Sequence, residues 1–181
     1  IGGGTPSKDN PDFYTGDIPW ATVRDMKSET IAVTEYKISK EAVKMSSTSI
    51  ISRNNVVIAT RVGLGKVCFL EKDTAINQDL KGVVPRNANE LSVQYLFWWF
   101  KNISDVIAKE GTGATVQGVK LPFIKSLEIP LPPLAEQKAI VKKLDALSGE
   151  TKKLEAIFRR KIVDLDELKK SVLKQAFSGE L

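Results

Sequence analysis

The feature that most constrains this chain is a long segment after Pro133 that contains no proline. From Leu134 to Phe177 it holds a single glycine, Gly149, and its apolar residues return at alternating spacings of four and three. Because proline ends or kinks helices, its absence together with this spacing predicts one long α-helix with a heptad seam. The seam consists of Ile140, Leu144, Leu147, Leu154, Phe158, Leu165, Leu168 and Val172, and Thr151, Lys161 and Gln175 interrupt it with polar side chains.

A helix of this length extends about 65 Å, so it needs a second helix to cover its seam. One solution is an antiparallel hairpin with a turn at Ser148-Gly149-Glu150. One internal glycine costs only about 1 kcal/mol in a helix, however, and no proline enforces a reversal. We therefore favour a continuous helix that pairs with a helix of another chain, or with a part of the same protein that this sequence lacks.

The part of the chain before this helix reads as mixed α and β structure. Short β-type runs separated by turn residues predict strands at residues 30–36, 55–60, 65–70, 82–84 and 127–131. Ser92 is a candidate cap for a helix over residues 93–109. The predicted fold class is thus α+β: a mixed α/β domain over residues 1–133, followed by a long coiled-coil-forming helix over residues 134–181.

Composition removes several classes of function. The chain has no histidine, which excludes imidazole metal sites and histidine-based catalysis. Its one cysteine, Cys68, can form neither an internal disulfide nor a cysteine-cluster zinc site, and this suits a reducing cytoplasm. No apolar run reaches the roughly 20 residues of a membrane span. The first residue is Ile1, so we expect a fragment or a processed chain.

No segment of the sequence fits a known motif for catalysis or for cofactor binding. Residues 61–66 contain Gly63 and Gly65, but the phosphate-binding loop of nucleotide hydrolases needs four residues between its glycines and a Ser or Thr after the lysine. Here Val67 follows Lys66. Carboxylates do not cluster in the sequence, so we expect no metal, no cofactor and no catalysis by this chain alone.

The net charge of +5 permits a polyanionic partner without demanding one. Up to Pro133 the chain carries 16 basic and 14 acidic residues, and after it 11 basic and 8 acidic residues. Neither part is a basic tail. Any nucleic acid would have to be bound by positive charge that the fold gathers locally.

Several loops offer groups that suit phosphates or bases, each with a plainer alternative. Residues 3–8 present backbone N–H groups, hydroxyls and an ammonium, or are a solvated turn. Thr22 and Arg24 would share one face of a strand, where the arginine could contact guanine or form a surface salt bridge. The neighbouring Trp20 reads more as a packing anchor than as a stacking platform. Residues 77–78 could pair with adenine or be ordinary turn material.

In combination these segments are far more specific. Gly3-Gly4-Thr5-Pro6-Ser7, residues 16–20, Asn77-Gln78, Gly113-Ala114-Thr115 and the run from Ile129 through Pro132-Pro133-Leu134-Ala135-Glu136-Gln137 occur in this order, and residues 173–181 close the chain. The sequence resembles the DNA specificity subunits of type I restriction–modification systems over essentially its whole length.

The resemblance implies a non-catalytic protein that reads one half of a bipartite duplex site. Residues 1–133 would be a target recognition domain. Residues 134–181 would be the conserved helix that acts as a spacer, pairs in an antiparallel coiled coil and docks methyltransferase subunits, with motor-nuclease subunits joining the complex. The pairing helix would come from a second copy of this chain or from a second specificity half.

The resemblance also marks the residues expected near DNA. They are Thr5, Ser7, Lys8, Trp20, Thr22, Arg24, Arg61, Lys66, Asn77, Gln78, Thr112, Thr115 and Gln117. Lysines and loop hydroxyls would contact phosphates, whereas Arg24, Arg61, Gln78 and Gln117 would contact base edges. Two other hypotheses stay open at this point: a coiled-coil scaffold without DNA specificity, and the recognition fragment of a fused restriction–methylase.

Overall fold

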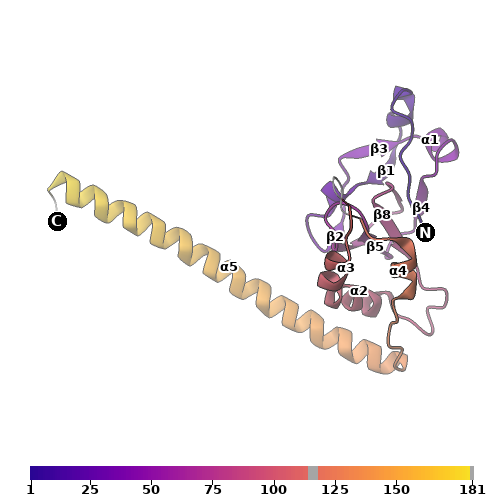
Figure 1. Ribbon diagram of the computed structural model, residues 1–181. Coiled ribbons are helices and arrows are strands. Elements are labelled where there is room, and N and C mark those ends of the chain that lie inside the picture. The colour runs from indigo at the N-terminus through magenta and orange to yellow at the C-terminus, as the bar shows by residue number, and fades with distance from the viewer. Residues whose placement is uncertain (114–117, 180–181) are drawn as a thin grey trace. The chain divides into compact units, whose positions relative to one another are not determined.

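The computed structural model describes residues 1–113 and 118–179. The chain divides into two compact units, Ile1–Lys138 and Ala139–Leu181. The first unit contains two four-stranded sheets and short helices, and the second consists of the greater part of helix α5 (Leu134–Ser178). This is the α+β class that the sequence predicts, with the long helix at its carboxyl end (Figure 1).

The first sheet has the strand order β3-β1-β7-β4. Strand β1 pairs parallel with β7 and antiparallel with β3, and β4 pairs antiparallel with β7. In this register Trp20 lies between Tyr36 and Ala75. The strands are β1 (Ile18–Ala21), β3 (Tyr36–Ile38), β4 (Ser49–Ile51) and β7 (Thr74–Ile76).

The second sheet has the order β2-β6-β5-β8. Strand β2 pairs parallel with β6, and β5 pairs antiparallel with both β6 and β8. Its strands are β2 (Thr30–Ile31), β5 (Val56–Ala59), β6 (Val67–Leu70) and β8 (Leu80–Val83).

Strand β5 shows how alternation along a buried strand builds two cores. Val57 and Ala59 join a cluster that includes Ile51 and Ile76 of the first sheet, so the two sheets pack face to face. Val56 and Ile58 point the other way, into a cluster formed with helices α2 (Val93–Asn102) and α3 (Ser104–Lys109). All four β5 side chains are buried, as expected for a strand covered on both faces.

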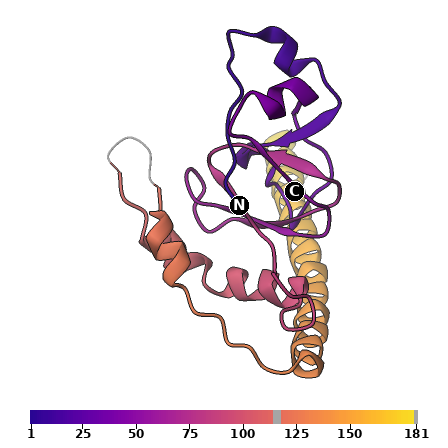
Figure 2. The same ribbon diagram turned by 90° about the vertical axis from the view of Figure 1, so that its right-hand side faces the viewer.

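A third, smaller cluster covers the outer face of the first sheet. Trp20, Ile38 and Ala75 pack there with Ala42 of helix α1 (Lys40–Lys44). The 3-10 helix η1 (Pro11–Tyr14) lies next to it and contributes two aromatic side chains. Figure 2 shows η1 and α1 on one side of the sheets and α2 on the other.

Three local expectations from the sequence are wrong. Residues 30–36 are not one strand, because β2 and β3 belong to different sheets. The helix expected over residues 93–109 is two helices, α2 and α3, which meet at Ile103. Residues 127–131 lie outside any strand: Pro130 removes a ladder donor, and Leu127 and Ile129 pack against the α2–α3 cluster instead. A short helix, α4 (Leu121–Ser126), precedes them.

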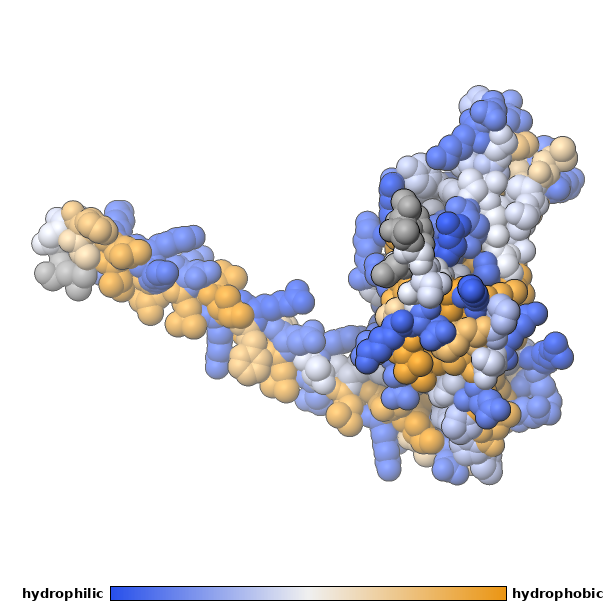
Figure 3. Space-filling model, in the orientation of Figure 1, coloured by the Kyte–Doolittle hydropathy of each residue, from blue (hydrophilic) through white to orange (hydrophobic). Residues whose placement is uncertain are grey.

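Helix α5 is continuous through Gly149, as we favoured, so the hairpin alternative is wrong. Leu147, Leu154, Phe158, Leu165 and Leu168 of the seam are each more than half exposed. Figure 3 shows apolar side chains following the helix along its length. Further exposed apolar side chains lie off the seam, at Ile157, Ile162, Val163, Leu173 and Phe177.

The first turn of α5 belongs to the first unit, and there the side chain of Gln137 is fully buried. Its Oε1 accepts from the backbone N–H of Ser92 at 2.9 Å, and its Nε2 donates to the carbonyls of Glu90 and Pro132 at 2.7 and 2.8 Å. The amide is thereby satisfied on both sides. Across residues 1–113 and 118–179, no helix joins the length and the apolar character that crossing a membrane requires.

Candidate nucleic-acid interface

One hollow in the first unit, of about 900 Å³, brings together residues that are distant in the sequence. We call it the polar hollow. Seven of the predicted DNA-contacting residues line it: Thr5, Lys8, Trp20, Thr22, Arg24, Asn77 and Gln78. Its other lining residues are Pro11, Tyr14, Val23, Tyr36, Val62 and Asp79.

The glycine-rich segment reaches this hollow because it packs tightly along the end of β7. The backbone N–H of Gly4 donates to the carbonyl of Ile76 at 3.0 Å. The Gly4 carbonyl accepts from Trp20 Nε1 at 3.2 Å and from Thr48 Oγ1 at 2.9 Å. A Cβ at Gly3 would collide with backbone carbonyl oxygens of Ile76 and the residue after it, so only glycine fits. The segment is therefore not a loose solvated turn.

This packing places Thr5 beside the turn that follows β7. The Thr5 hydroxyl contacts Gln78 Oε1, and the Gln78 side chain is exposed. Asn77 is only 5% exposed, and its amide is occupied: Nδ2 donates to Asp79 Oδ2 at 3.0 Å, and Oδ1 accepts from the Asp79 N–H at 3.1 Å. Asn77 thus shapes the turn, whereas Gln78 exposes its amide and engages only its Oε1, with Thr5.

Trp20 is 6% exposed, with its indole N–H committed to Gly4, and it makes edge-on ring contacts with Tyr14 and Tyr36. It therefore forms the wall of the polar hollow and anchors the packing. Little of the ring is open for stacking on a base.

Thr22 and Arg24 do not share a strand face, so that expectation is wrong. Strand β1 ends at Ala21, and Thr22 caps the 3-10 helix η2 (Val23–Asp25). The Thr22 hydroxyl accepts from the Arg24 N–H at 3.2 Å, and Asp25 Oδ2 accepts from the Thr22 N–H at 2.7 Å. The cap leaves the Arg24 side chain 75% exposed, 3.8 Å from Glu35. An ion pair this exposed contributes little, so the guanidinium is available to another anion.

Arg61 lies next to the polar hollow rather than in its lining. Its Nη1 is 3.7 Å from Asp79 Oδ1, and the arginine side chain is 48% exposed. The backbone of Arg61 forms an isolated antiparallel β-bridge with Gly118. Gly118 in turn exchanges two backbone hydrogen bonds of 3.0 Å with Thr112. Gly118 thereby lies between Arg61 and Thr112. Thr115 and Gln117 lie outside the described residues.

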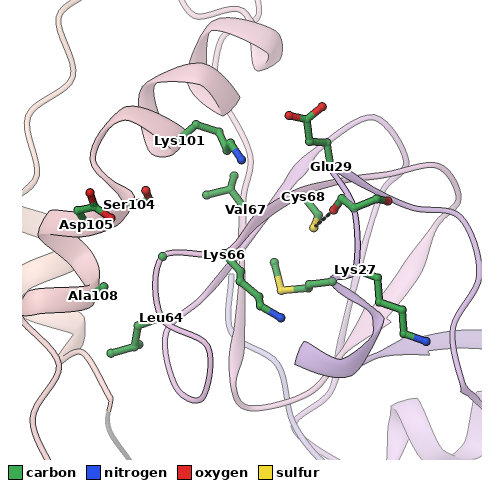
Figure 4. A pocket seen from close by; sticks show the side chains of 13 residues that line it. Lys27, Glu29, Leu64, Lys66, Val67, Cys68, Lys101, Ser104, Asp105 and Ala108 are labelled. Atoms are coloured by element: carbon green, nitrogen blue, oxygen red, sulfur yellow. Dashed lines mark hydrogen bonds between the residues drawn. The ribbon is translucent and has the colours of Figure 1, made fainter. Parts of the chain in front are cut away.

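Lys66 is separated from this group. It lines a second hollow of about 380 Å³, the lysine hollow, together with Lys27 and Lys101 around Cys68 (Figure 4). The Cys68 thiol donates to the Ser28 carbonyl at 2.9 Å, and burial raises the pKa of the thiol to about 11. A thiol that stays protonated at neutral pH is a poor nucleophile, so the chemically relevant groups of this hollow are its charged side chains, the three lysines with Glu29 and Asp105.

Lys8 and Ser7 complete the predicted set. Lys8 lines the polar hollow and is exposed. The Ser7 hydroxyl, also exposed, donates to Asp9 Oδ2 at 3.2 Å. Among residues 1–113 and 118–179, no three carboxylate or thiol side chains come together as metal ligands.

Six residues that line the polar hollow were not among those predicted from the sequence: Pro11, Tyr14, Val23, Tyr36, Val62 and Asp79. Asp79 holds Arg61 and brings the only acidic side chain among the lining residues. The signal for Asp79 was present in the spacing Asn77-Gln78-Asp79, which is typical of a turn closed by its own side chains. Strand pairing and loop conformation bring Tyr36 and Val62 to the hollow, and no sequence motif indicates either residue.

A family model confirms the relationship that the motifs indicated. Residues 1–160 match the model described as the type I restriction modification DNA specificity domain.

Curated relatives agree. The specificity subunit of the type I restriction enzyme EcoR124I/EcoR124II from Escherichia coli is 35% identical over 151 residues, which are 80% of this chain and 37% of that protein. The type I restriction enzyme MjaIX specificity subunit from Methanocaldococcus jannaschii is 29% identical over 172 residues, 91% of this chain and 39% of that protein. The chain thus spans about two fifths of the length of these relatives.

Solved structures share the fold. The HsdS subunit from Thermoanaerobacter tengcongensis superposes with a TM-score of 0.71 at 21% identity, covering 100% of this chain and 42% of that one. A chain from a study of complex assembly in the type I R-M system superposes with a TM-score of 0.83 at 22% identity, covering 100% of this chain and 43% of that one.

Proposed function

Because this chain belongs to the family of type I restriction modification DNA specificity domains, we propose that residues 1–133 bind duplex DNA in a sequence-specific manner. The observation that carries the proposal is the polar hollow, where the fold gathers seven of the residues expected at DNA from three separate segments of the chain. In this proposal the chain is a non-catalytic reader that directs the adenine methylation and the restriction performed by other subunits.

The contacts divide by chemistry. Lys8, Lys66 and the hydroxyl of Thr5 suit phosphate oxygens, which position the protein without reading sequence. Arg24, Arg61 and Gln78 suit base edges, because guanidinium groups match guanine and amides match adenine in the major groove. Arg24 can leave its exposed partner Glu35 at small cost, whereas Arg61 must exchange Asp79 for the base. Thr112, Thr115 and Gln117 complete the set of DNA contacts in this proposal.

Residues 134–181 serve as a spacer in this proposal. The exposed seam of α5 needs a second helix, which a second copy of this chain or a second specificity half would supply. Antiparallel pairing of two such helices would hold two recognition domains a fixed distance apart. The target would then be bipartite, as two-fold symmetry requires of a dimeric reader.

Apolar side chains off the seam support docking of other subunits. On a heptad, Val163, Leu173 and Phe177 face away from the seam, so a helix pair leaves them uncovered. We assign this side of α5 to methyltransferase subunits, through which motor-nuclease subunits join the complex. The complex would work in the cytoplasm, where its DNA lies.

The test is binding to a duplex selected from a random library. Neutralising phosphates releases counterions, so the affinity is expected to fall steeply as salt rises. Arg61→Ala should weaken binding to the selected duplex by about 1–3 kcal/mol if the guanidinium contacts a base. The control is Arg53→Ala, since Arg53 is exposed but lines neither hollow. A library that yields no preferred sequence, together with a flat salt titration, would overturn the proposal.

A further inference from the structure

Val62 has a backbone conformation that its side chain disfavours. Its φ is +47°, in the left-handed region, where a residue branched at Cβ is a rare outlier. The side chain is also 51% exposed, so burial of its methyl groups does not offset the strain. Strained residues of this kind persist where the surroundings hold them, and they gather at functional sites.

The surroundings of Val62 hold it firmly. On its amino side, the N–H groups of Thr60 and Arg61 donate to the Asp79 carbonyl at 2.8 and 3.3 Å. On its carboxyl side, Gly63 takes a φ of +71°, and its carbonyl accepts from the Lys66 N–H at 3.2 Å. A Cβ at Gly63 would come within 2.9 Å of Val23, so the loop lies directly against helix η2. The valine is therefore presented to solvent by a braced loop.

The braced loop presents an exposed aliphatic side chain beside hydrogen-bonding and charged groups. Val62 lines the polar hollow, in which Thr5, Lys8, Arg24 and Gln78 offer hydrogen bonds or charge. In the major groove, the only apolar group on a base edge is the 5-methyl group of thymine, which apolar side chains contact. We propose that Val62 reads a thymine by contact with this methyl group. The inference rests on the proposed function, since it concerns the same surface.

The direct test removes the methyl group from the DNA. In the duplex selected from the random library, each thymine in turn is replaced by deoxyuridine, which differs from it only by lacking that methyl group. We expect one replacement to weaken binding roughly fourfold, the factor that corresponds to one buried methyl group. Unmodified synthetic DNA carries this group only on thymine, so the readout is not shared with methylated cytosine.

Three variants tie the effect to Val62. Val62→Ala removes the γ-methyl groups, and it should abolish the difference between thymine and deoxyuridine at that one position. Val62→Asn places there a residue that tolerates positive φ, so it should lose the same discrimination while its Tm equals or exceeds that of the unaltered chain. The control is Val33→Asn, because Val33 is 80% exposed and does not line the polar hollow. It should keep the discrimination.

The outcomes separate this inference from the proposed function. If no sequence is selected, the proposed function fails, and with it the role of Val62. If a sequence is selected but the alanine and asparagine variants discriminate against deoxyuridine as the unaltered chain does, the role of Val62 alone is overturned. A Tm of Val62→Asn far below that of the unaltered chain would show that the valine serves the fold instead.

Discussion

At the scale of single residues, Gln137 explains why the start of the long helix carries so distinctive a motif. In the sequence, Pro132, Pro133 and Glu136 read as ordinary helix-start signals. The structure adds that the glutamine one turn into the helix is fully buried and bonded to Ser92, Glu90 and Pro132. A buried amide that donates and accepts in this way cannot be replaced without leaving backbone groups unpaired.

Gln137→Ala should therefore lower the free energy of unfolding of the first unit by about 3 kcal/mol, because a buried N–H and two carbonyls lose their partner. Gln137→Glu should be at least as harmful at pH 7, where an ionised carboxylate would face two carbonyls, and less harmful near pH 4, where the acid is protonated and keeps one donor. Chemical denaturation at both pH values measures this. Lys138→Ala is the control, since Lys138 is exposed. Equal stability of all three variants would contradict the role of the amide.

At the scale of elements, helix α5 runs without a break through Gly149. Nothing in the described residues lies within 4 Å of a Cβ placed at this glycine, so close packing does not demand it. The Thr151 hydroxyl donates to the Leu147 carbonyl at 2.9 Å, which keeps this part of the helix locally bonded. Gly149 thus lowers the helix propensity of this segment, and packing within the chain does not require it.

Gly149→Ala should stabilise α5 by about 0.5–1 kcal/mol, since alanine lowers the backbone entropy that folding removes and fits without contact. Thermal unfolding followed by circular dichroism at 222 nm checks the expected rise in helix stability. The matched change Ala146→Gly, one turn earlier at an exposed position, should lower it by a similar amount. A loss of stability in Gly149→Ala would show that a partner helix packs closely against the glycine.

At the scale of the whole molecule, the seam of α5 leaves a row of apolar side chains exposed. Leucine and phenylalanine side chains more than half exposed along one helix favour association, because pairing removes their apolar surface from water. Lys161 interrupts this seam and lies 6.0 Å from the centre of the Phe158 ring. A polar residue inside a seam reduces stability and helps to select one register of pairing.

We expect the chain to self-associate through the seam, and Leu165→Lys to shift it toward monomer at concentrations where the unaltered chain is dimeric. The control is Val163→Lys, which places the same charge two residues away on the side opposite the seam. Sedimentation velocity over a range of concentrations measures both. A chain that is monomeric at every concentration, or a control that dissociates equally, would overturn pairing between two copies through this seam.

Local pattern was sufficient for the long helix, for strands β5 and β6, and for the family, because heptad spacing, buried β-branched runs and ordered motifs are properties of short stretches of sequence. It found only the end of β8, and it predicted no range for β1, β4 or β7. It could not assign residues 30–36 to two sheets, nor find that Leu127 and Ile129 pack against the α2–α3 cluster instead of joining a sheet, since both depend on partners far along the chain.

For the candidate site the division is similar. The sequence by itself determined which segments carry hydroxyls, amides and cations, and it named seven of the residues that line the polar hollow. Only the tertiary structure decided that Asn77 is consumed by its own turn, that Lys66 lies in a different hollow, and that Val62 and Asp79 belong to the site. The physical reason is that a side chain can bind a partner only where packing and hydrogen bonding leave its polar groups free. Packing and hydrogen bonding are in turn set by contacts between residues distant in sequence.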